Sequence, residues 1–116
     1  IAEITPNARM AKEAPLAIVV CGDMRNESND LVREFWVQDA SAATQNILLA
    51  AHAMELGAVW TGTYPAQNRC EAISQLLNLP SSIIPFSTIV IGYPKETQQP
   101  KDKWKEENIS YEVFGE

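Results

Sequence analysis

One stretch of the chain, residues 36–65, constrains the fold more than any other. It predicts a long helix over about residues 35–56 that is apolar on nearly every side, then Gly57 as a helix stop, a buried strand over residues 58–62 and a turn. A helix without a wide polar face is expected to lie inside a protein. Gln45 and Asn46 interrupt this helix, and a buried polar pair needs hydrogen-bonding partners. Backbone groups, the pair itself or a polar ligand beside the helix could provide them.

Length and composition are those of one globular domain. The chain has 116 residues, of which 46% are hydrophobic and 21% are charged. Its net charge of −6 argues against nucleic-acid binding, which normally uses a basic patch. No apolar run reaches the roughly 18 residues of a membrane span. Cys21 and Cys70 have no metal-binding spacing and no signal segment is visible, so we expect reduced thiols and a cytoplasmic protein.

The remaining segments predict an alternation of strands and helices. We expect a short helix over residues 6–13, a buried central strand over 16–22, a loop over 24–33, an amphipathic helix over 67–78, a strand over 87–92, a polar loop over 96–103 and an edge or exchanged strand over 108–114. Such an alternation predicts an α/β layered domain.

Five segments together resemble the short bacterial type of the FMN-dependent nitroreductase family. They have the family's order and spacing and cover almost the whole chain: EAPLAIVVCGD (13–23), WVQDASAATQNILLAA (36–51), LGAVWTGTYP (56–65), LNLPSSIIPFSTIVIGYP (77–94) and PKDKWKEENISYEVF (100–114). The resemblance implies an α+β domain with a central, mainly antiparallel sheet surrounded by helices. It also implies a homodimer in which the two subunits exchange their C-terminal tail strands.

The family has a further segment before the position that corresponds to Ile1. That segment holds a phosphate-binding motif with arginine and serine, which this sequence does not contain. The resemblance therefore implies that residues 1–116 form a single domain that corresponds to the C-terminal two-thirds of a nitroreductase, truncated at its N-terminus. We expect weak FMN binding from these residues alone.

The sequence offers little for hydrolytic or metal chemistry. It has one histidine and no HxxxH pair, CxxC pair, P-loop or GxGxxG motif. His52 is more typical of a satisfied core residue than of a catalyst, and Phe35 and Trp36 of core packing than of a substrate lid or dimer contact. An enzyme that carries a cofactor can lack such groups, because the cofactor performs the reaction.

A candidate cofactor site lies where the strand over residues 58–62 ends. Gly62 allows a flat ligand to approach the backbone closely, although a plain strand-to-loop glycine explains the same residue. In the family this turn donates a backbone N–H to flavin N5. The resemblance assigns that donor to Gly62 and Thr63, with Trp60 and Thr61 along the same edge.

A second group of candidates lies near the C-terminus. Lys101 and Lys103 match the family's basic pair that contacts the FMN phosphate and ribityl chain, where the second residue is usually arginine. A solvated run of charges is the alternative for both lysines. Gln45 and Asn46 complete the residues that we expect to contact the cofactor.

The resemblance implies an FMN-dependent oxidoreductase. NAD(P)H would give a hydride to FMN and leave, and a nitroaromatic, quinone or similar acceptor would then take the electrons in the same site. Two alternatives stay open: a dehalogenase or flavin-modifying relative, and a non-catalytic dimerisation or interaction fragment. We expect no metal, nucleic acid or membrane as partner.

Overall fold

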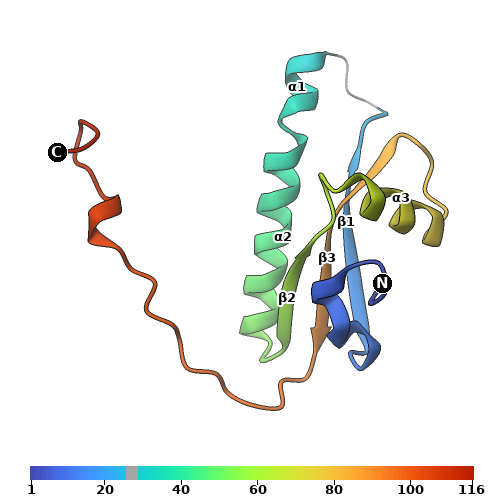
Figure 1. Cartoon of the computed structure of the whole chain (residues 1–116), viewed down its shortest axis with the longest axis horizontal. Helices are drawn as coiled ribbons and strands as arrows, with labels where there is room; N and C mark the ends of the chain where they lie inside the picture. The colour runs from blue at the N-terminus through green and yellow to red at the C-terminus, as the bar shows by residue number, and fades with distance from the viewer. Residues whose placement is uncertain (26–28) are drawn as a thin grey trace.

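A three-stranded antiparallel sheet forms the centre of the protein (Figure 1). The computed structural model describes residues 1–25 and 29–116. Strand β1 spans Leu16–Asp23, β2 spans Gly57–Gly62 and β3 spans Ile83–Gly92, in the spatial order β1-β3-β2. β3 pairs with both neighbours and is buried over most of its length. The fold is therefore α+β with an antiparallel sheet, as predicted.

The position of the strands within the sheet differs from the sequence prediction. β1 was predicted to be central and β2 to be buried, but each has β3 as its one strand neighbour among the described residues. Both predictions are wrong. Val59 and Trp60 of β2 keep 38% and 37% of their surface exposed. Apolar runs identify strands, but they do not say which strand has neighbours on two sides.

Helices cover both sides of this sheet. α2 (Trp36–Ala53) packs along one side and contacts all three strands, and η1 (Pro6–Lys12, a 3₁₀-helix) and α3 (Gln67–Leu76) lie on the other side (Figure 1). None of the helices in the described ranges is long and apolar enough to cross a membrane.

A short helix, α1 (Asp30–Glu34), precedes α2 within the segment that we predicted as a loop. Asp30 lies in its first turn, where a negative charge interacts favourably with the helix dipole. Residues 26–28 of the predicted loop lie outside the described residues. The prediction of a continuous loop over residues 24–33 is thus wrong at its C-terminal end.

The long helix has one buried side and one exposed side. Ala40, Thr44 and Ala51 are buried, whereas Leu49 is 58% exposed. The expectation of a helix buried all round is wrong for the described residues, because the sheet covers only one side of it. Alanines make this helix look apolar on every side, and they tolerate solvent as well as burial.

The residue that ends α2 is also not the predicted one. Glu55 adopts the left-handed conformation with φ 61°, and the Leu56 N–H donates to Ala51 O at 2.9 Å while the Glu55 N–H donates to His52 O at 3.0 Å. These two bonds form a Schellman cap. Gly57, which we predicted as the helix stop, instead begins β2.

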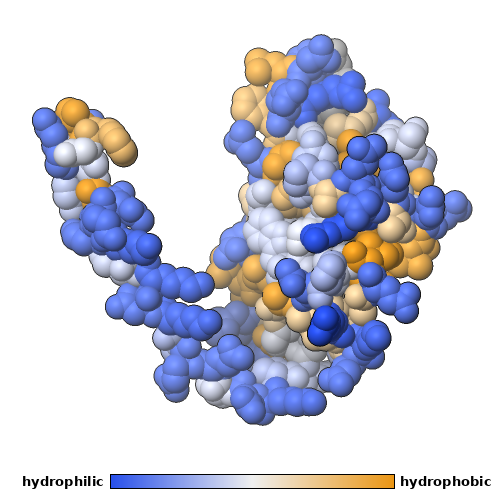
Figure 2. Space-filling view, viewed as in Figure 1, coloured by the Kyte–Doolittle hydropathy of each residue, from blue (hydrophilic) through white to orange (hydrophobic). Residues whose placement is uncertain are grey.

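The C-terminal tail, residues 93–116, extends away from the rest of the chain (Figure 1). It contains one short 3₁₀-helix, η2 (Glu106–Asn108), and no strand over residues 108–114. The predicted strand does not form within this single chain, because the tail has no strand beside it to pair with. Hydrophobic side chains stand exposed near its tip (Figure 2). Phe114 is 97% exposed.

Two buried threonines should respond in opposite ways to the isosteric change to valine. Thr5 Oγ1 is buried without a hydrogen-bond partner among the described residues. Thr44 Oγ1 donates to Ala40 O at 2.7 Å and lies 2.9 Å from Ser87 Oγ. We expect Thr5→Val to raise the free energy of unfolding by about 1 kcal/mol and Thr44→Val to lower it by about 1–3 kcal/mol. Urea unfolding measures both, and a loss of stability in Thr5→Val would show that its hydroxyl is bonded.

Candidate functional site

The end of β2 is anchored to β3 by two threonine side chains. Thr61 Oγ1 donates to Thr88 O at 2.7 Å, and Thr63 Oγ1 lies 3.4 Å from Thr88 Oγ1. All three threonines are buried, with at most 3% of their surface exposed. Thr61 and Thr63 were predicted to lie at the cofactor edge, and the structure places their side chains in the core beneath that edge.

The backbone at this point directs one amide outward. The Thr63 N–H donates to Phe86 O at 3.2 Å, so it points toward β3. Successive peptide groups of an antiparallel strand alternate between the partner strand and the opposite direction. The Gly62 N–H therefore points to the open edge of β2. Of the two amides that the sequence suggested as donors, Gly62 has the one directed outward.

No described protein atom lies where a side chain at Gly62 would project. A Cβ built on Gly62 would meet no described atom within 4 Å, and the residue itself is exposed. A flat ligand can thus lie against this face of Gly62 without displacing a side chain. This combination of a strand-end amide and an open approach is the feature that the sequence predicted for a cofactor edge.

An arginine that sequence reasoning missed lies at the same edge. Arg69, in the first turn of α3, donates through Nη1 to Gly62 O at 3.1 Å. Gly62 O and the Gly62 N–H point the same way, because they belong to one residue of a strand. The contact joins residues seven positions apart through a turn. The only signal in the sequence is a basic residue shortly after the predicted turn, which is too common to single out.

Aromatic side chains gather beside the end of β2. The Trp36 ring lies edge-on to Tyr64 and Phe86, with centroid distances of 4.8 and 5.8 Å, and the Trp60 ring lies 6.0 Å from Phe86. Trp60 and Tyr64 are 37% and 38% exposed. The rings of Trp60 and Tyr64 therefore form the exposed rim of this cluster, and both residues lie two positions from Gly62 in the sequence.

The other predicted cofactor residues lie elsewhere in this single chain. Gln45 and Asn46 are exposed on α2, so solvent can satisfy their amides. The premise of a buried pair is therefore wrong. The contact of Gln45 and Asn46 with a cofactor stays a prediction. Lys101 and Lys103 lie on the C-terminal tail, which Figure 1 shows directed away from β2.

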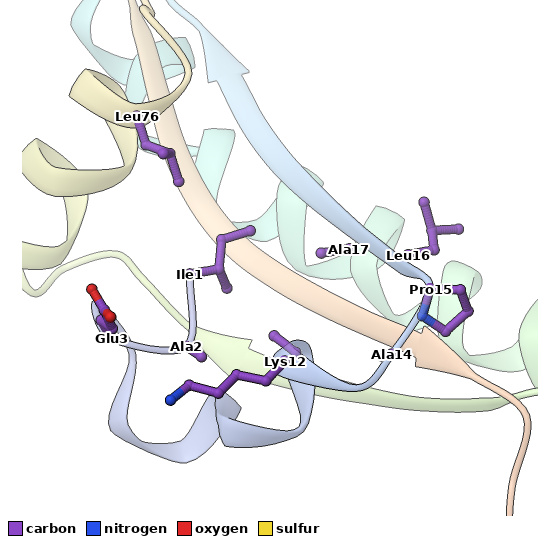
Figure 3. A pocket seen from close by; sticks show the side chains of 10 residues that line it. Ile1, Ala2, Glu3, Lys12, Ala14, Pro15, Leu16, Ala17 and Leu76 are labelled. Carbon is purple, nitrogen blue, oxygen red and sulfur yellow. The ribbon is translucent and has the colours of Figure 1, made fainter.

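Two hollows of the surface lie away from Gly62. One, of about 430 Å³, lies between the N-terminal residues, β1 and the end of α3, as Figure 3 shows with Ile1, Lys12 and Leu76. The other, of about 1110 Å³, is bordered by His52 and by the start of the tail. None of the residues that we predicted to bind the cofactor lines either hollow. The candidate site is an open strand edge and not a closed cavity.

Both cysteines are free thiols. Burial raises the pKa of the Cys21 thiol, and burial likewise raises the pKa of Cys70, whose Sγ donates to Pro85 O at 3.6 Å. A raised pKa keeps a thiol protonated at neutral pH, and the protonated form is a poor nucleophile. Neither thiol is therefore an activated nucleophile.

A small antiparallel sheet has a long helix packed along one side and an open glycine edge. This is the α+β domain that the resemblance to nitroreductases implied. Residues 3–93 match the model of the nitroreductase family, so the chain belongs to the nitroreductase family.

Named relatives agree with this membership. The chain is 48% identical over 114 residues to a Methanothermobacter thermautotrophicus protein named "Putative NADH dehydrogenase/NAD(P)H nitroreductase", an alignment that covers 98% of this chain and 58% of the relative. A solved structure of the same name from Parabacteroides distasonis superposes with a TM-score of 0.88 at 46% identity, over 97% of this chain and 64% of that one.

A third relative carries a cofactor in its name. The structure of the FMN-dependent nitroreductase from Clostridium difficile R20291 has a TM-score of 0.76 at 25% identity, over 98% of this chain and 72% of that one. The present chain thus spans little more than half of the Methanothermobacter relative and about two thirds of the first solved structures.

Proposed function

We propose that the protein is an FMN-dependent oxidoreductase that uses NAD(P)H to reduce nitroaromatics, quinones or similar acceptors. Family membership supports the reaction class, and the names of the relatives supply NAD(P)H and FMN. The single observation that carries the proposal to this chain is the uncovered face of Gly62 at the end of β2, beside an N–H that the strand pairing directs outward.

The residues at this edge fit a flavin ring. The ring is flat, and Gly62 leaves room for a flat group against the backbone. The outward amide can donate one hydrogen bond to a ring nitrogen, and Trp60 and Tyr64 offer aromatic surface beside it. Donors aimed where negative charge develops favour the reduced state of a bound flavin.

The phosphate end of FMN would be held by Lys101 and Lys103 in this proposal. Both lysines lie on the C-terminal tail, which does not approach Gly62 within its own chain (Figure 1). A homodimer in which each tail reaches the other subunit would bring the lysines and Gly62 into one site. Exposed Tyr111, Val113 and Phe114 on the tail would be covered in such a pair.

FMN would supply the hydride chemistry, while the chain binds and orients. Gly62 would fix the ring edge through its N–H, the threonines beneath would hold the strand end rigid, and the lysines would neutralise phosphate charge. We also propose a cytoplasmic location, which the two free cysteines support because thiols stay reduced there.

FMN binding and reduction test the proposal together. Apo-protein is titrated with FMN while flavin fluorescence is followed, and NADH or NADPH is then added without oxygen to see whether the bound flavin loses its visible absorbance. We expect saturable binding of about one FMN per chain and reduction by at least one nucleotide. A protein that binds no FMN would instead support the alternative of a non-catalytic dimerisation or interaction module.

Sedimentation tests the homodimer separately from the cofactor. We expect one dimeric species at low micromolar concentration, and a stable folded monomer would contradict the exchange of tails.

A further inference from the structure

We propose that Arg69 is a positioning residue that fixes the carbonyl of Gly62, the residue whose N–H points outward, and brings a positive charge to the cofactor edge. Its side chain donates to Gly62 O at 3.1 Å. The positioning of the Gly62 backbone is inferred from this chain alone. The effect of the positive charge on bound FMN rests on the proposed function.

The Gly62–Thr63 peptide group is held at both of its polar atoms. On one side the Thr63 N–H donates to Phe86 O at 3.2 Å, and on the other side Arg69 donates to Gly62 O. Glycine is the residue with the greatest backbone freedom, so the peptide group that follows a glycine needs outside contacts to keep one direction. The Thr61 side chain, bonded to Thr88 O, fixes the preceding residue in the same way.

The charge of Arg69 has no carboxylate partner among the described residues. The ion pairs there are Asp23 with Arg25 and Glu13 with Lys95. The nearby Glu71 side chain accepts a hydrogen bond from Gln67 Nε2 at 3.3 Å. A guanidinium has five N–H donors, and the contact with Gly62 O uses one of them. The others remain available to an anionic ligand.

This arrangement favours a reduced over an oxidised flavin at the edge. Reduction adds negative charge to the ring, and a cation held beside the outward amide stabilises that charge. Arg69 differs from Lys101 and Lys103 in this respect, because its position is set within the same chain as Gly62 by a hydrogen bond.

The first measurement is made without any cofactor. Amide hydrogen exchange of Thr63 is compared in apo wild type, Arg69→Met and Arg9→Met, where Arg9 is an exposed arginine of η1. We expect Arg69→Met to speed exchange at Thr63 several-fold with an unchanged circular dichroism spectrum, and Arg9→Met to leave it unaltered. Equal protection in wild type and Arg69→Met would overturn the positioning role.

The second measurement uses the FMN-loaded protein. The two-electron midpoint potential should fall in Arg69→Met by about 30 mV, which corresponds to a tenfold loss in the preference for reduced flavin. Arg69→Lys, which keeps a cation, should recover most of this difference, and Arg9→Met should match the wild type. An unchanged potential in Arg69→Met would overturn the electrostatic part. If the wild type holds no FMN, the proposed function and the electrostatic part both fail. The exchange rates of Thr63 then still decide the positioning role.

Discussion

Replacing Gly62 by valine should lower the affinity for FMN roughly 10- to 100-fold while leaving the protein folded. The valine side chain would occupy the space in which a built Cβ meets no atom within 4 Å, and forcing a flavin past it costs about 1–3 kcal/mol. Folding should not suffer, because β-branched residues suit a strand and nothing in the described chain is displaced.

Gly57→Ala is the matched control for this prediction, since it changes a glycine at the other end of the same strand. Its Cβ would lie 3.5 Å from Gly92 O, an ordinary contact. FMN fluorescence titration gives both dissociation constants and thermal unfolding gives both melting temperatures. If Gly62→Val bound FMN as tightly as Gly57→Ala, the cofactor would have to lie elsewhere.

A second large effect is expected at Gly22, on stability. A Cβ at this buried position would overlap the Trp36 ring and lie 2.8 Å from Met24 Cε. We expect Gly22→Ala to lower the free energy of unfolding by about 1–3 kcal/mol, because overpacking forces the indole out of its place against Tyr64 and Phe86.

The same Gly57→Ala variant serves as reference in urea unfolding. Alanine without a clash restricts the unfolded chain, so that change should be neutral or stabilising by up to about 1 kcal/mol. A Gly22→Ala protein as stable as the Gly57→Ala protein would show that the Trp36 ring can move aside freely.

The positions of the strands were readable because each is a run of apolar, β-branched residues. Their spatial order was not, because three such runs look alike and only pairing decides which lies in the middle. β3 begins earlier than predicted, at Ile83, and includes Pro85. A proline argues against a central strand, because it has no backbone N–H to donate. In β3 the register of pairing with β1 shifts between Val20 and Cys21, next to the Cys21–Pro85 pair, so the proline lies at an irregularity of the sheet.

The candidate site was predictable in part. The candidate edge at Gly62 was predicted from a glycine at the end of a strand, whereas the Arg69 contact depends on how the turn brings α3 back to β2. Gln45 and Asn46 were singled out on the assumption of a buried helix, and their exposure shows that a helix rich in alanine does not reveal which side faces the sheet. The roles of Lys101 and Lys103 stay predictions, because the tail that carries them is directed away from β2 within this chain (Figure 1).

The central claim, that FMN lies against Gly62, can be tested directly by nuclear magnetic resonance on protein labelled with ¹⁵N-glycine. The chain has only five glycines, and the Gly62 signal is identified by its loss in Gly62→Ala. On addition of FMN we expect the Gly62 amide to shift strongly, while Gly57 and Gly92, which pair at the other end of β2, stay in place. Saturable FMN binding that leaves the Gly62 amide unmoved would contradict the account.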